Sequence, residues 1–104
     1  MIRLTILYPN SEGATFDMDY YLGTHVPMSK QLQGSALKSF TVDQGFGTGI
    51  PDEKPPHLVI ANLVYDSMDA FLEAFMPHME ELQGDIANYT NVQPIIQFSQ
   101  IMLD

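Results

Sequence analysis

The sequence predicts a single α+β domain, residues 1–104, whose elements follow in the order βαββαβ. Segments that alternate like strands and segments with helical periodicity succeed one another in that order. Two segments fifty residues apart, 18–34 and 68–84, are identical at seven of seventeen positions, as expected for a split βαβ fold with two similar halves. The length of 104 residues suits one modest core and leaves no room for a second domain.

The first half supplies a strand, a helix and a strand. Ile2–Tyr8 alternates between two faces and is predicted to be a strand, and the polar residues 10–15 form a turn. Asp17 is the predicted N-cap of a helix that ends near Gly34. Residues 36–46 are the second predicted strand, and a loop follows over 47–56, where glycine and proline are concentrated.

The second half repeats the pattern. His57–Tyr65 is the clearest strand, and both of its faces are apolar. Ser67 is the predicted N-cap of the second helix, which carries Pro77 in its interior. Residues 92–103 are the last predicted strand, and Pro94 places its beginning at a sheet edge or bulge. Because a strand with two apolar faces needs a cover on each side, we expect a second subunit on the face without helices.

Composition excludes several classes of partner and chemistry. Thirteen acidic against four basic residues give a net charge of −9, so neither nucleic acid nor an anionic membrane surface is an expected partner. The absence of cysteine excludes disulfides, thiolate zinc sites and cysteine nucleophiles, and it fits a reducing cytosol. The N-terminal apolar run is too short for a signal peptide and nothing is long enough to span a membrane, so we expect a cytoplasmic protein.

The two aligned helices share a proline and differ at a histidine. Pro27 aligns with Pro77, so the same kink is expected in both helices and is architectural. His25 aligns with Phe75, which predicts that position 25 points inward, toward the sheet. Pro27 also removes the donor that the carbonyl of Gly23 would otherwise accept, which leaves an acceptor close to the imidazole.

His25 is the candidate general acid or base, because imidazole is the side chain that changes charge near neutral pH. Tyr21, four residues earlier, has the same inward phase, and a phenol and an imidazole at that spacing can hold one substrate oxygen between them. The alternative is a core histidine that bonds only to Tyr21 or to a backbone carbonyl.

Three further residues are candidates for contact with a substrate. Tyr8 and Tyr65 each end a predicted strand near a helix connection, where pockets in such folds often lie. Asp17 lies two turns before His25 on the same side of the helix, so its carboxylate can influence the imidazole.

Metal and phosphate sites are not expected. The three histidines show no HxH or HxxxH spacing. The glycines of residues 45–49 are followed by a proline-rich loop, whereas a phosphate site would need a helix N-terminus there. The serines lack a GxSxG context.

The motif that runs from Tyr8-Pro9 through Phe16-Asp17, Tyr20-Tyr21, His25 and Pro27 resembles the EthD family, named for ethyl tert-butyl ether degradation, within the dimeric α/β barrel superfamily. The resemblance covers the whole chain in length and element order. It implies a ferredoxin-like fold, an antiparallel sheet with two helices on one face, and a homodimer formed through the open sheet face. It also implies a small cavity between sheet and helices that works without metal or organic cofactor. Pro77 and Pro94 depart from the simple family pattern.

The resemblance implies a range of functions. Some relatives isomerise lactones or dehydrate and cyclise polyketide intermediates, others oxygenate quinols or degrade haem, and the EthD protein itself accompanies a cytochrome P450 system. For this chain we expect a cofactor-independent lyase or isomerase of a small oxygenated cyclic or aromatic compound, with His25 and Tyr21 as catalytic residues. The alternative is a binding or accessory protein for a hydrophobic metabolite in a degradation pathway. A third, purely structural interpretation requires that no cavity lies beside His25.

Overall fold

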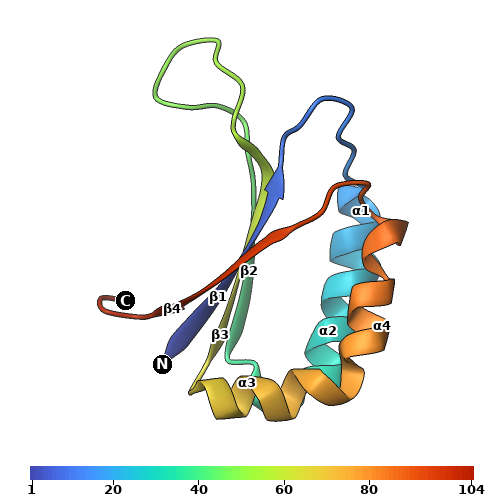
Figure 1. Ribbon diagram of the computed structural model, residues 1–104, viewed down its shortest axis with the longest axis vertical. Coiled ribbons are helices and arrows are strands. Elements are labelled where there is room, and N and C mark those ends of the chain that lie inside the picture. Colours follow the sequence, from blue (N-terminus) through green and yellow to red (C-terminus); the bar gives the residue numbers. More distant parts are fainter.

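Four strands form one antiparallel sheet in the computed structural model, which describes residues 1–104 (Figure 1). The strands are β1 (Ile2–Pro9), β2 (Ser39–Gln44), β3 (His57–Tyr65) and β4 (Ile95–Gln100), and their order in the sheet is β2-β3-β1-β4. The predicted ferredoxin-like βαββαβ fold is therefore confirmed. The last strand is shorter than expected and begins directly after Pro94; it pairs only with β1, so its predicted place at a sheet edge is confirmed.

The first helix is continuous although it contains a proline. Asp17 accepts a hydrogen bond from the backbone of Tyr20 and begins α1 (Met18–Tyr20) as the predicted cap. A π-helical turn (Tyr21–His25) follows and leads into α2 (Val26–Gln33), where the chain leaves the helix at Gly34 with a φ of 63°. In the wider turn the amide N–H of Val26 donates to the carbonyl of Tyr21, five residues back. The next residue, Pro27, has no amide hydrogen to donate.

The second helix is divided in two by its proline. Ser67 caps α3 (Met68–Phe75), Pro77 lies in the 3₁₀ turn Met76–His78, and α4 (Met79–Gly84) follows. Figure 1 shows α3 lying across one end of the molecule, whereas α4 turns to run beside α2. The prediction of one shared kink is therefore wrong: Pro27 is accommodated by a widened turn, and Pro77 separates two helices of different direction. None of these helices has the length and hydrophobicity to cross a bilayer.

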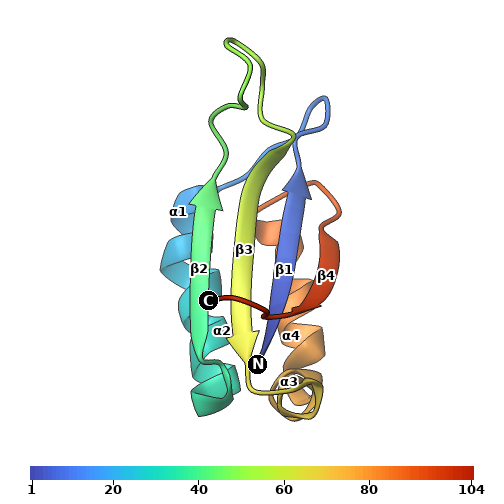
Figure 2. The same ribbon diagram turned by 90° about the vertical axis from the view of Figure 1, so that its left-hand side faces the viewer.

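The helices cover one face of the sheet, and the hydrophobic core lies between the helices and that face. Alternate side chains of the two central strands point toward the helices, and one buried cluster lies under α3 while the other lies under the first helix. The sheet supplies Leu4, Tyr8, Val59, Ala61, Leu63 and Tyr65 to this core. Figure 2 shows the opposite face, which no helix covers. The candidate site lies where the two buried clusters meet.

Candidate functional site

A cavity of about 190 Å³ lies between the sheet and the helices and takes its walls from both core clusters. Thirteen of its 18 lining residues are hydrophobic, and the polar side chains on its wall include His25, Ser29 and Gln33, spaced four residues apart along one helix. A cavity of about 150 Å³ is enough to bind benzene. The space therefore matches a compound with one ring and a few small substituents.

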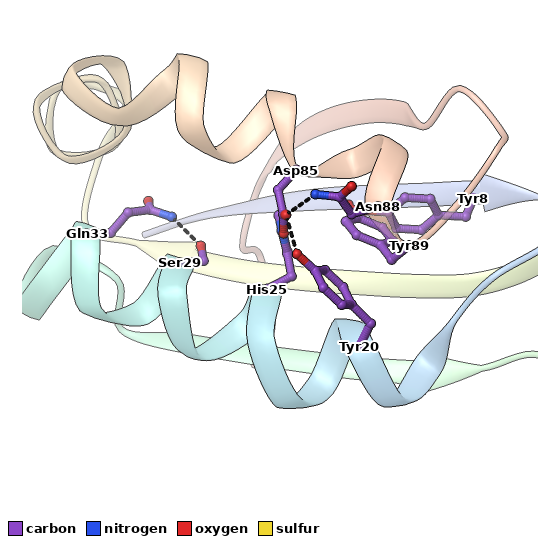
Figure 3. Close-up of polar contacts among 8 residues, drawn as sticks. All are labelled: Tyr8, Tyr20, His25, Ser29, Gln33, Asp85, Asn88 and Tyr89. Carbon is purple, nitrogen blue, oxygen red and sulfur yellow. Dashed lines mark hydrogen bonds and ion pairs between the residues drawn. The ribbon is translucent and has the colours of Figure 1, made fainter.

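The imidazole of His25 is held at this wall by a carboxylate from the other end of the chain. Its Nδ1 lies 2.8 Å from Oδ2 of Asp85, the residue that directly follows α4, and both side chains are nearly buried. Figure 3 shows the two side chains meeting between the helices. Since an ionised carboxylate can only accept, Nδ1 carries the hydrogen of this bond.

Asp85 is kept ionised by its surroundings. Burial by itself raises the pKa of Asp85, but hydrogen bonds from Tyr20, Asn88 and His25 together outweigh that effect, so its pKa lies below the ordinary value. The Tyr20 hydroxyl donates to Oδ1 over 2.6 Å, and Nδ2 of Asn88 donates to the same oxygen over 2.9 Å. The carboxylate therefore stays charged and faces Nδ1 throughout the neutral pH range.

The second nitrogen of His25 is left free for chemistry. Nε2 has no hydrogen-bond partner in the protein. It is accessible, because every fully buried side-chain nitrogen or oxygen has a partner, and the residue to which it belongs lines the cavity. With Nδ1 protonated, the neutral ring presents a lone pair at Nε2. That arrangement suits a general base whose resulting cation would lie beside Asp85.

Tyrosines surround the imidazole. The Tyr21 ring stacks on the His25 ring with centroids 5.4 Å apart and an angle of 13° between the planes. The Tyr89 ring lies 4.8 Å from each of them, and its hydroxyl is 2.8 Å from that of Tyr8. Burial raises the pKa of Tyr8, Tyr21 and Tyr89. These phenols remain neutral, and they are hydrogen-bond donors rather than bases.

The structure brings together three of the five predicted site residues. His25, Tyr21 and Tyr8 line the cavity. Tyr65 is buried behind the wall, where its hydroxyl donates to Gln33. Asp17 is exposed and caps α1, and the carboxylate that contacts His25 is Asp85 instead.

Asp85 and Tyr89 were not found by sequence reasoning. The sequence does contain a signal for Asp85: the two aligned segments both end in glycine, and the next residue is the acidic Asp85 in the second copy but Ser35 in the first. No group of three or more histidine, cysteine, aspartate or glutamate side chains converges as a metal site would require.

Residues 12–93 match the EthD domain. The chain belongs to the EthD family. An EthD-like protein from Ralstonia eutropha JMP134 is 36% identical and has a TM-score of 0.94, with 99% of this chain and 93% of that chain covered. No protein of curated function matches the sequence.

More distant structures share the fold of this EthD-family chain. An ethyl tert-butyl ether degradation family protein from Bacillus halodurans C-125 is 16% identical with a TM-score of 0.67, covering 98% of this chain and 99% of that one. An Arabidopsis thaliana protein is 10% identical with a TM-score of 0.69, covering 100% and 98%. At these identities the similarity shows the ferredoxin-like architecture alone.

Proposed function

We propose that this EthD-family protein is a cofactor-independent lyase or isomerase of a small, oxygenated, single-ring compound, with His25 as its general acid and base. The observation that carries the proposal is the placement of one imidazole: Nδ1 bonds to Asp85, Nε2 has no partner in the protein, and the residue lines a largely apolar cavity. The cavity beside His25 also argues against the purely structural interpretation of this histidine.

The proposed reaction begins with the transfer of a proton from a carbon next to a carbonyl to Nε2. The imidazolium that forms lies beside the Asp85 carboxylate, and the electron pair moves onto the carbonyl oxygen as an enolate. Tyr21 and Tyr8 are neutral phenols that can donate to this oxygen. Return of the proton to another carbon isomerises the compound, and its delivery to a departing hydroxyl eliminates water.

The second candidate is a protein that binds such a compound without changing a bond, as an accessory to a degradation pathway. The apolar character of the cavity supports this candidate: 13 of the 18 lining residues are hydrophobic and can bury an apolar ligand, and only a few polar groups are present to fix its orientation. The two candidates share the ligand and differ in whether a proton moves.

Binding to the cavity is tested by following the ring signals of the histidines in NMR while lactones, quinones and substituted phenols are added. We expect at least one single-ring compound to shift the His25 signals. The signals of His57 and His78, which do not line the cavity, serve as internal controls and should stay in place. A product or solvent deuterium in the ligand supports the enzyme, and tight retention without either supports the binding protein. If the His25 signals stay fixed across the panel, the cavity proposal is wrong.

We also propose that the chain forms a homodimer through the open sheet face. Leu7 pairs with Ile60 across the strands, on the side that no helix covers, and Val64 extends this apolar surface. Met102 and Leu103 of the C-terminal segment are 88% and 91% exposed, and this segment is tied to the same face through the ion pair of Asp104 with Arg3. Burial of these side chains favours association. Sedimentation at micromolar concentration should give a dimer, and a monomer there would contradict the proposal.

A further inference from the structure

A chain of three hydrogen-bonded side chains, separate from the pair of His25 and Asp85, reaches the cavity wall, and the proton transfer to His25 described above does not involve it. The Tyr65 hydroxyl donates to Oε1 of Gln33 over 2.5 Å, and Nε2 of Gln33 donates to Oγ of Ser29 over 2.8 Å. All three residues are buried, with exposures of 0%, 6% and 3%. Ser29 and Gln33 line the cavity, whereas Tyr65 lies behind it. The chain of hydrogen bonds therefore runs from the core to the cavity wall.

The direction of this chain follows from what each group can donate. The Tyr65 hydroxyl has Gln33 as its one partner, so an amide turned the other way would leave a buried phenolic hydrogen without an acceptor. The amide oxygen therefore faces Tyr65, and the amide nitrogen faces Ser29. Oγ of Ser29 accepts from that nitrogen, and no group of the protein accepts the hydrogen of the Ser29 hydroxyl. That hydrogen is available to a ligand in the cavity.

Ser29 lies one turn after His25 on the same face of the helix, as Figure 3 shows. Side chains four residues apart on a helix are about 5–6 Å apart at their Cβ atoms, which is within the reach of one small ring. The cavity thus offers two complementary groups. Nε2 of His25 accepts, because Asp85 holds the hydrogen at Nδ1, and the Ser29 hydroxyl donates, because Gln33 occupies its oxygen.

We propose that Ser29 selects the ligand by donating a hydrogen bond to its carbonyl oxygen, and that Tyr65 sets this preference from behind the wall by orienting the Gln33 amide. The inference rests on the proposed function and narrows its substrate class to ring compounds that carry a carbonyl together with a hydroxyl or an acidic C–H on the same side. Ser29 touches the ligand. Gln33 and Tyr65 are positioning residues.

Three matched probes separate the two hydrogen bonds: 3-hydroxyacetophenone carries the carbonyl and the hydroxyl, acetophenone carries the carbonyl without the hydroxyl, and 3-ethylphenol carries the hydroxyl without the carbonyl. Dissociation constants are measured for the wild type, Ser29→Ala, Tyr65→Phe and the exposed control Ser35→Ala. We expect Ser29→Ala to weaken the two ketones about three- to tenfold, the effect of one neutral hydrogen bond. The affinity for 3-ethylphenol should stay within about twofold, and Ser35→Ala should behave as wild type.

Tyr65→Phe tests the orientation of the amide, because without the phenol the amide can turn and accept from Ser29. The ketones should then weaken about three- to tenfold while 3-ethylphenol holds or improves. Equal weakening of all three probes in both variants would overturn the inference and leave the proposed binding function standing. Failure of all three probes to bind the wild type would overturn both.

Discussion

Asp85→Asn is expected to lower proton abstraction in the cavity by about 10²- to 10⁴-fold, the range attributed to a positioned general base. The asparagine side chain can present its amide nitrogen to Nδ1 of His25, which places the imidazole hydrogen on Nε2 and removes the lone pair that faces the cavity. The carboxylate that stabilises the imidazolium is lost at the same time. The rate is measured as incorporation of solvent deuterium into the methyl group of acetophenone, which has no hydroxyl to occupy Nε2, and the dissociation constant of acetophenone should change only a few fold.

Asn88→Ala is the matched control for this substitution. It removes one exposed neutral donor from Oδ1 of Asp85 and leaves the bond between Asp85 and His25 in place, so deuterium exchange should stay within a few fold of wild type. Wild-type exchange that persists unchanged in Asp85→Asn would show that the pair is not the base. A wild-type protein that binds the probe and catalyses no exchange would favour the accessory role.

The fold could be predicted from the sequence because its signals are local. His57–Tyr65 was predicted with the bounds that the structure gives it, since a run of nine largely apolar residues after two prolines, rich in β-branched side chains, allows little else. Asp17 and Ser67 mark the helix starts because a side-chain cap is a contact over three residues. The two prolines were harder to interpret: whether the chain widens a turn at Pro27 or changes direction at Pro77 depends on what each helix packs against.

The site was only half predictable, for a physical reason. The inward position of His25 could be inferred by comparison with Phe75, and both residues do line the cavity. Its partner could not, because His25 and Asp85 are 60 residues apart and meet only after α4 has turned back beside α2. The same holds for Tyr65, which looks like a pocket residue at a strand end but reaches the cavity through Gln33. Pairings of this kind depend on helix packing rather than on sequence spacing.

The pair of Asp85 and His25 should also make the stability of the protein sensitive to acid. The pKa of Asp85 is lower in the folded protein than the value of about 3.9 expected for an unfolded chain. The carboxylate therefore contributes its full stabilisation at pH values above the pKa of the unfolded chain. This contribution is lost as the pH falls from the unfolded pKa to the lower pKa of the folded protein. Asparagine does not titrate, so Asp85→Asn should lower the free energy of unfolding by about 1.5–3 kcal/mol at pH 7, the worth of hydrogen bonds to a charged group.

The difference between wild type and Asp85→Asn should shrink as the pH falls below about 4, because protonated aspartic acid and asparagine are both neutral there. Urea unfolding at pH 7, 5, 4 and 3 measures this difference in the free energy of unfolding. Asp19→Asn is the control, since the Asp19 carboxylate is exposed and forms no hydrogen bond or ion pair in the structure. A difference of equal size at every pH would mean that the substitution disturbs packing rather than removing a charge. A difference that closes below pH 4, with Asp19→Asn close to wild type throughout, would tie the stabilisation to the ionised carboxylate that orients the imidazole. One charge would then serve both stability and the proposed chemistry, so stability and deuterium exchange should fall together in variants of Asp85.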